Sequence, residues 1–195
     1  MWSTERAPEL AAEHLQELGD RWRHVQTVGT LAESLVDACF LPEDVWCAAW
    51  LHDIGYSFTA HVTGLHSLDG AHYLSDLGAP CEVVALVGWH TGAAFEAEER
   101  GLRGVLAQLP EPDPTKLDAL TLLDLVSAPD GTVTTPQERI DEILERYGPG
   151  EAVHKAVSRS GRALLTSADR ARTSFGLSDM WPIGVLDSVR EAQAH

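Results

Sequence analysis

Apolar residues recur at helical spacing along most of the chain. Over residues 21–38, positions three or four apart carry the side chains of His24, Val28, Leu31 and Leu35. This period predicts a helix with one buried face, and Asp20 is placed to cap its N-terminus. The imidazole of His24 is therefore expected to point into the core together with the aliphatic side chains.

A second helix is predicted after Pro42, because proline suits the first turn of a helix. Residues 45–51 read VWCAAWL and are apolar all round, which predicts a fully buried helix. The helix ends in His52 and Asp53, and Gly55 is expected to form its C-cap. Two polar groups thus stand at the end of the most apolar helix of the chain.

In the remaining sequence, glycine and proline mark the expected ends of helices. They predict further helices over residues 65–77, 81–90, 94–100, 116–127, 137–147 and 151–174. Thr115 is the expected cap of the helix over residues 116–127. Residues 58–64 and 128–135 are predicted to be loops, and the prolines between residues 110 and 114 predict a stiff connector. No segment alternates polar and apolar residues as a strand would, so the predicted fold class is all-α.

Composition and charge narrow the range of partners. The chain has 195 residues, of which 44% are hydrophobic, enough for a sizeable core, and its formal net charge is -16. Such an acidic surface repels nucleic-acid polymers and anionic membranes. A small phosphate ester is still admissible as a partner, because a bound cation can reverse the field inside one pocket.

The sequence also indicates where the protein resides. It has neither a signal peptide nor a run of the ~20 apolar residues needed to span a membrane. The cysteines, Cys39, Cys47 and Cys81, form no CxxC pair, which argues against a disulfide framework or a zinc knuckle. The expected localisation is the reducing environment of the cytoplasm.

Four polar residues stand where the pattern predicts burial, namely His24, His52, Asp53 and Asp124. Asp124 lies within the apolar sequence LLDLV. A carboxylate buried there without a partner would cost several kcal/mol, so a compensating charge is expected. Two imidazoles and two carboxylates make a mixed nitrogen and oxygen donor set that suits a divalent metal.

Two further histidines extend this set. His66 and His90 each share a predicted helix face with small, aromatic or apolar residues. Three roles are open for them: they could hold a second metal, contact substrate oxygens, or donate a proton to a leaving group. Two ions about 3.5–4 Å apart are a common arrangement for phosphoester hydrolysis.

The order His24, then His52-Asp53, then Asp124 resembles the H…HD…D signature of the HD-domain metal-dependent phosphohydrolase superfamily. The segments RWRHVQTVG, AAWLHDIGYS, HSLDGAHYL, VGWH and LLDLV are similar to the corresponding helices, over about residues 20–128. The resemblance implies a compact helical bundle over residues 1–128 around a metal held by these four residues. We expect residues 129–195 to form C-terminal helices packed on the same domain.

The resemblance extends in part to the second histidine pair. His66 and His90 are similar to the extra pair of the two-metal members, such as the cyclic-dinucleotide phosphodiesterases and the di-iron oxygenases. Tyr56 follows HDIG where many phosphodiesterase members carry lysine, so no cationic phosphate clamp is expected at that position. The sequence therefore assigns the chain to no characterised branch of the superfamily.

Three residues are predicted to contact the substrate. Arg21 and Arg23 flank the histidine of the first helix and would reach a phosphate at the mouth of the site, or else form a solvated pair on the outer face. His61 is a candidate pocket residue from the loop that follows HDIG. Asp69, three residues after His66, would either orient that imidazole or lie exposed on its helix.

The predicted function is a metal-dependent phosphohydrolase acting on a small phosphate ester, such as a nucleotide. Asp53, His66 and His90 are the predicted catalytic residues, and one or two ions of Mn, Fe, Co, Ni or Mg are chemically admissible. A di-iron oxygenase and a non-catalytic protein that binds a metal or ligand are the alternatives. The expected partner is a small phosphorylated molecule, and the sequence does not indicate an oligomeric state.

Overall fold

A computed structural model describes residues 2–39 and 41–185, apart from the side chains of Asp37 and Cys39. Within these residues it contains helices and loops and no strand, only an isolated bridge between Ser127 and Val133. The predicted all-α class is confirmed. The elements are η1 (Thr4–Arg6), α1 (Ala7–Leu15), η2 (Gln16–Leu18), α2 (Asp20–Cys39), α3 (Glu43–Leu51), η3 (Ile54–Tyr56), α4 (His66–Asp76), α5 (Cys81–Trp89), η4 (His90–Gly92), α6 (Ala93–Glu99), α7 (Arg103–Leu106), α8 (Pro114–Leu125), α9 (Pro136–Arg146) and α10 (Ala152–Ser174).

Most of these helices lie where the hydrophobic pattern predicts them. The observed ends of α2, α4, α5, α6, α9 and α10 lie within one residue of the predicted ends. The structure adds α1 and α7, which the pattern did not predict. Among the described helices, none combines the length and the apolar character needed to cross a membrane.

The start of α8 differs from the prediction. Asp113, and not Thr115, is the N-cap: its carboxylate accepts hydrogen bonds from the backbone N–H groups of Thr115 at 2.8 Å and Lys116 at 3.3 Å. Pro114 takes the first helical position, where a backbone N–H is not required. As a result α8 begins and ends two residues earlier than expected, and Asp124 lies in its last turn.

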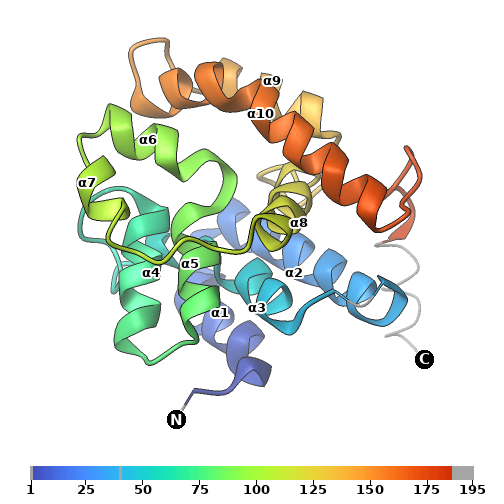
Figure 1. The fold of residues 1–195 in the computed structure, drawn as a ribbon, viewed down its shortest axis with the longest axis horizontal. Helices are drawn as coiled ribbons and strands as arrows, with labels where there is room; N and C mark the ends of the chain where they lie inside the picture. Colours follow the sequence, from blue (N-terminus) through green and yellow to red (C-terminus); the bar gives the residue numbers. More distant parts are fainter. Residues whose placement is uncertain (1, 40, 186–195) are drawn as a thin grey trace.

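The hydrophobic core is built around α3, which contacts α1, α2, α5 and α8 (Figure 1). Most of its residues are buried: Val45, Cys47, Ala48, Ala49, Trp50 and Leu51. Trp46 is only partly buried, so α3 is not enclosed on every side as its composition predicts. The burial of α3 places the residues that follow it, His52 and Asp53, deep in the molecule.

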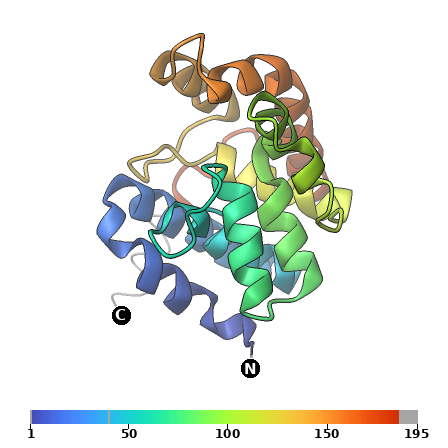
Figure 2. The same cartoon turned by 90° about the vertical axis from the view of Figure 1, so that its left-hand side faces the viewer.

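The helices after residue 128 contribute to the same core. Ile140 of α9 and Val157, Leu164 and Ala168 of α10 belong to the cluster of buried residues that includes α3. The helix α10 packs on α8 and α6, and both views show α9 and α10 covering one end of the bundle (Figures 1 and 2). The C-terminal helices therefore close over the helices that carry the predicted site.

Gly55 is not the C-cap of α3 as predicted. His52 takes that position, and Gly55 lies in η3. A Cβ atom on Gly55 would lie 1.9 Å from the backbone oxygen of His66 and 2.7 Å from the backbone nitrogen of Gly70. Glycine is required because η3 packs directly on the backbone of α4. This close approach brings Asp53, just before η3, beside His66.

Candidate metal centre

Side chains from α2, α4, α8 and the turns after α3 and α5 converge inside the bundle. They are His24, His52, Asp53, His66, His90 and Asp124. Five of them are buried, and the most exposed of these five, Asp124, is only 7% exposed, while His66 is partly buried. The structure thus brings together all six residues that the sequence predicts as a metal site.

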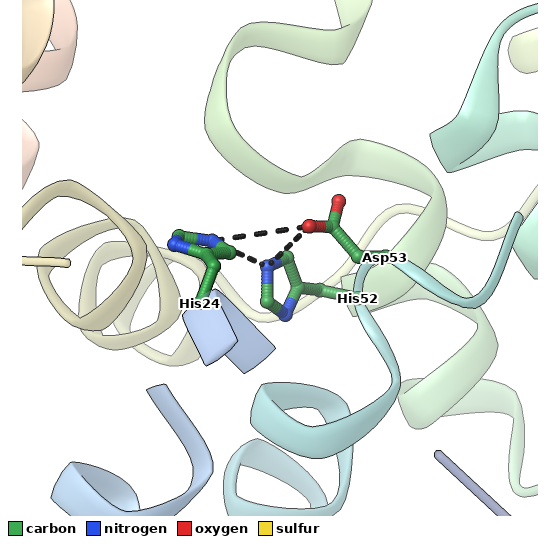
Figure 3. A group of neighbouring side chains, drawn as sticks. All are labelled: His24, His52 and Asp53. Carbon is green, nitrogen blue, oxygen red and sulfur yellow. Dashed lines mark hydrogen bonds and ion pairs between the residues drawn. The ribbon is translucent and has the colours of Figure 1, made fainter. Parts of the chain in front are cut away.

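The first donor group comprises His24, His52 and Asp53 (Figure 3). The Nε2 atoms of His24 and His52 lie 3.2 Å apart. Oδ2 of Asp53 lies 3.4 Å from Nε2 of His52 and 3.8 Å from Nε2 of His24. Oδ1 of Asp124 lies 3.1 Å from Nε2 of His24. Asp124 therefore adjoins the group of His24, His52 and Asp53 through His24.

Asp53 also belongs to a second donor group, with His66 and His90. Its other oxygen, Oδ1, lies 3.4 Å from Nε2 of His66, and the Nε2 atoms of His66 and His90 lie 3.1 Å apart. The rings of His52 and His90 have centroids 5.3 Å apart, so the two groups are adjacent. Asp53 offers one oxygen to each group, as a carboxylate that bridges two ions would.

Three of the histidines are oriented through their Nδ1 atoms. Nδ1 of His24, His52 and His90 lies at 3.3, 2.9 and 2.6 Å, respectively, from the backbone oxygens of Ala128, Ala49 and Val87. A carbonyl oxygen only accepts, so each Nδ1 carries a hydrogen, and a ring in its neutral form directs its Nε2 lone pair into the site. Histidines that bind metals commonly have this arrangement.

Both carboxylates are ionised despite their burial. Burial acts to raise the pKa of Asp53, but the Arg21 guanidinium and the neighbouring imidazoles hold this pKa well below its ordinary value. Burial acts on Asp124 in the same direction, and its interactions with His24 and His52 outweigh it, so the pKa of Asp124 is also far below its ordinary value. The site therefore keeps two negative charges in the interior.

The histidines differ in their affinity for protons. Burial lowers the pKa values of His24 and His90, and it lowers that of His66 to about 3. Burial also acts against protonation of His52, but the adjacent Asp53 carboxylate outweighs it and raises the pKa of His52. Most of the imidazoles are thus neutral and available as ligands at neutral pH.

His24 shows why a cation fits between these groups. A neutral imidazole has one N–H, which cannot donate both to the Ala128 carbonyl and to the Asp124 carboxylate. A divalent ion between Nε2 and the carboxylate removes this conflict. Donor atoms bound to one ion at about 2.1 Å lie roughly 3.0–3.4 Å from each other. The separations of 3.1, 3.2 and 3.4 Å around His24 and His52 match that range, and the 3.8 Å between His24 and Asp53 lies above it.

Arg21 and Tyr56 border the metal centre. Nη1 of Arg21 donates a hydrogen bond to Oδ2 of Asp53 at 2.6 Å, and its guanidinium lies 4.1 Å from the centroid of the Tyr56 ring. The Tyr56 ring stacks on His66, with centroids 4.3 Å apart. The chain has no lysine at position 56, and an arginine from α2 supplies positive charge beside it. Arg21 thus lies where the prediction of a substrate contact requires it.

Arg23 lies away from the site, so the predicted substrate contact is not formed and the alternative, a solvated position on the outer face, is the one observed for this residue. It pairs with Asp20, and its side chain is 56% exposed. The helix geometry explains the difference between the two arginines. Arg21 is three residues before His24 and shares its face of α2, whereas Arg23 is one residue before it and lies about 100° around the helix.

Two further predictions are wrong, for His61 in the loop after η3 and for Asp69 in α4. His61 does not line the pocket. Its side chain is 60% exposed, and its Nδ1 lies 3.9 Å from Oδ2 of Asp69. Asp69 is buried, and its carboxylate accepts hydrogen bonds from the backbone N–H groups of Val62, Thr63 and Gly64. Asp69 therefore shapes this loop, and it neither orients His66 nor lies exposed.

Residues that the sequence pattern did not reveal line a pocket over the metal centre. Arg139, Ile143 and Arg146 of α9, together with Tyr147, line it along with the metal-centre residues. The first three are separated by four and three positions, so they share one face of α9. The sequence signal that could have revealed them is the presence of two arginines on the same helix face as an isoleucine. Thr91, the residue after His90, lines the same pocket.

Comparison with known proteins agrees with this geometry. The HD domain family model matches residues 21–128, more than half of the chain. The matched segment contains the five residues of the two donor groups and also Asp124. No curated protein and no solved structure matches the chain. The assignment of individual residues as metal ligands stays a prediction. The chain belongs to the HD domain family.

Proposed function

We propose that the protein is a metal-dependent phosphohydrolase that acts on a small phosphate ester, such as a nucleotide. The observation that carries this proposal is the pair of adjacent His/Asp donor groups that share Asp53 within an HD domain. Hydrolysis of phosphate esters is typical of this family. The acidic chain as a whole repels phosphate, since its formal net charge is -16.

The residues of the two groups have distinct parts in this chemistry. His24, His52, Asp53 and Asp124 would hold the first divalent ion, and Asp53, His66 and His90 the second. A bound ion supplies Lewis acidity toward a phosphoryl oxygen and makes water more acidic. Arg21 stands beside Asp53, where its guanidinium can bind phosphoryl oxygens.

The other walls of the pocket control access of water. Val153, Val157 and Leu164 of α10 line it together with polar groups such as Arg21 and Asp124. Apolar side chains at this position limit the number of waters near the reacting group, which strengthens electrostatic contacts inside the pocket.

A substitution at Asp124 tests the proposal. The wild-type protein, loaded in turn with Mn, Fe, Co, Ni or Mg, is expected to release phosphate from at least one member of a panel of phosphomonoesters, phosphodiesters and nucleotides. Asp124→Asn is expected to lose metal affinity by at least roughly 10–100-fold and to lose the activity with it. Metal content by mass spectrometry and phosphate release measure the two effects.

Asp141→Asn is the matched control, because Asp141 is an exposed carboxylate on α9. It should keep wild-type metal content and activity. Tight metal binding by the wild type without turnover of any ester would contradict the proposal and favour a non-catalytic role. An Asp124→Asn variant that binds metal as the wild type does would contradict the assignment of this ligand.

A di-iron oxygenase is the second candidate function. The specific observation in its favour is the complete second donor group of Asp53, His66 and His90, which provides for a second ion. Anaerobic reconstitution with ferrous iron followed by Mössbauer spectroscopy separates the two functions. A coupled di-iron signal with uptake of O₂ supports the oxygenase, and phosphate release without O₂ supports hydrolysis.

A further inference from the structure

The pocket over the metal centre has a second wall that lies outside the segment matched by the HD domain. This wall comes from α9 and α10 and carries Arg139, Arg146, Val153, Val157 and Leu164. The whole chain has only 14 lysines and arginines against 30 aspartates and glutamates. Two arginines on one pocket wall are therefore a marked local concentration of positive charge.

Glu142 holds these two arginines in place. One of its carboxylate oxygens pairs with Nη1 of Arg139 and the other with Nη2 of Arg146, all on α9. Two guanidinium groups share one carboxylate, which leaves one positive charge in excess. Glu96 also lines the pocket, but it is paired with Arg100 at 2.7 Å.

Three residues that line this pocket each carry a buried donor that has no hydrogen-bond partner among the residues that the structure describes. These donors are Nε of Arg139 and the hydroxyl groups of Ser67 and Thr91. The Arg139 side chain is 8% exposed, and Ser67 is 1% exposed. A buried polar group without a partner costs roughly 1–3 kcal/mol, so three of them at one pocket indicate that oxygens of a ligand or of water accept from them.

The backbone at Thr91 is strained. Its φ of 37° and ψ of 55° lie in the left-handed region, which a β-branched residue rarely adopts. The next residue, Gly92, packs against α10, where an added Cβ would lie 3.2 Å from Oγ of Ser160. Strain of this kind gathers at ligand sites. The turn thus holds Thr91 on the lining of the pocket, directly after His90.

We infer that Arg139, with the hydroxyls of Ser67 and Thr91, forms an oxyanion site for a second anionic group of the substrate. The substrate class is a phosphate ester whose far end carries a carboxylate or a further phosphate. A short aliphatic segment between the two anionic groups would pack on Val157 and Leu164. The inference deepens the proposed function and rests on it for the position of the phosphoryl group at the metal centre.

The donor chemistry matches such a group. A guanidinium and two hydroxyls present several N–H and O–H donors, and the planar guanidinium is the side chain best suited to carboxylate and phosphate oxygens. Arg139 is already oriented by Glu142, so little side-chain freedom is lost when it binds. The site therefore favours a ligand with two anionic ends over a ligand with one.

Matched phosphonates, which this chemistry cannot hydrolyse, provide the test. The probes are ω-phosphonocarboxylates and α,ω-bisphosphonates of increasing chain length, each compared with the alkylphosphonate of the same length. Their affinities for the manganese-loaded protein are measured by isothermal titration calorimetry. At the fitting length, one of the two series with an anionic end is expected to bind roughly tenfold or more tightly than its alkylphosphonate. The series that gains identifies the second group as carboxylate or phosphate.

Variants assign this preference to Arg139. Arg139→Gln is expected to abolish it while metal content stays unchanged, and Arg139→Lys, which keeps the charge and loses the Nε donor, is expected to reduce it. The lysine variant also serves if the glutamine variant does not fold. Arg170→Gln is the matched control, because Arg170 pairs with Asp118 on the surface and does not line the pocket. It should keep the full preference.

The outcomes separate this inference from the proposed function. Equal affinities for anionic and alkyl ends in the wild type, or a preference that survives in Arg139→Gln, overturn the inference. If the wild type hydrolyses phosphate esters yet shows no such preference, the proposed function stands and the second anion site does not. If the preference depends on Arg139 while no ester is hydrolysed, the anion site stands and the phosphohydrolase function fails.

Discussion

Asp53 is the residue on which both donor groups depend, with one carboxylate oxygen facing each. Burial alone would raise its pKa, and the permanent charge of Arg21 at 2.6 Å is the strongest influence that lowers it. At the scale of single residues, the site is thus a balance between buried negative charge and a small number of positive groups. The neighbouring His66 makes this balance measurable.

His66 is expected to make the metal-free protein less stable in acid. Its pKa is lowered by burial to about 3 in the folded protein, from the ordinary value of 6.5 that applies when the chain is unfolded. Between these two pH values the unfolded chain binds a proton that the folded chain does not. The free energy of unfolding must therefore fall as the pH falls through this window.

Thermal denaturation in the presence of a chelator measures this effect. From about pH 7 to about pH 4, the wild type should lose more stability than His66→Gln, which lacks the titrating group. His61→Gln is the control, because the His61 side chain is exposed on a loop, and it should follow the wild type. Parallel losses in the wild type and in His66→Gln would refute the assignment.

At the scale of elements, the contact between η3 and α4 determines the geometry of the site. Gly55 lets the two backbones meet, and this brings the Asp53 carboxylate to 3.4 Å from His66. Glycine is needed at position 55 because there is no space for a side chain. The φ angle of Gly55 lies outside the left-handed region, so backbone conformation does not require a glycine there. A side chain at this position must push η3 away from α4.

Gly55→Ala is therefore expected to destabilise the fold by on the order of 3 kcal/mol and to weaken metal binding, because backbone atoms cannot yield as a flexible side chain can. Urea denaturation and metal titration measure the two effects. Gly104→Ala in α7 is the matched control, since no atom lies within 4 Å of its added Cβ. It should be neutral or stabilising by up to about 1 kcal/mol. Wild-type stability of Gly55→Ala would disprove the steric argument.

At the scale of the whole molecule, the C-terminal helices belong to the pocket as well as to the core. Ile140, Val157 and Leu164 pack in the cluster that includes α3, and Arg139 and Arg146 line the pocket. The HD domain match ends at residue 128, before all of them. The family segment thus supplies the residues of the candidate metal centre, and the segment after it supplies further residues that line the same pocket.

Metal binding is expected to stabilise the whole fold. The donors come from helices far apart in sequence, so the unfolded chain offers no assembled site. A metal at 100 times its dissociation constant would add about 2.7 kcal/mol to the free energy of unfolding, which corresponds to roughly 5–11 °C in Tm for a chain of this size. Differential scanning calorimetry with manganese and with a chelator measures the shift. A Tm that does not respond to either would contradict the metal site.

The sequence alone determined most of the helices and the residues of the candidate metal centre. Periodicity is a local property, so it located α2, α4, α5, α9 and α10, and it placed His24 and Asp124 among apolar side chains where only compensated polar groups are tolerated. The same geometry applied to Arg21 and Arg23 would have separated the arginine at the site from the exposed one. These features depend only on residues a few positions apart.

The tertiary structure decided what depends on separate segments meeting. In the folded protein the backbone of residues 62–64 donates hydrogen bonds to Asp69, and Gly55 packs against α4. Arg139 of α9 lines the same pocket as candidate metal-centre residues that come from other helices. No local pattern encodes these outcomes, because each depends on the long-range packing of helices against a shared core. The composition of the pocket, and with it the expected substrate, is therefore a property of the fold.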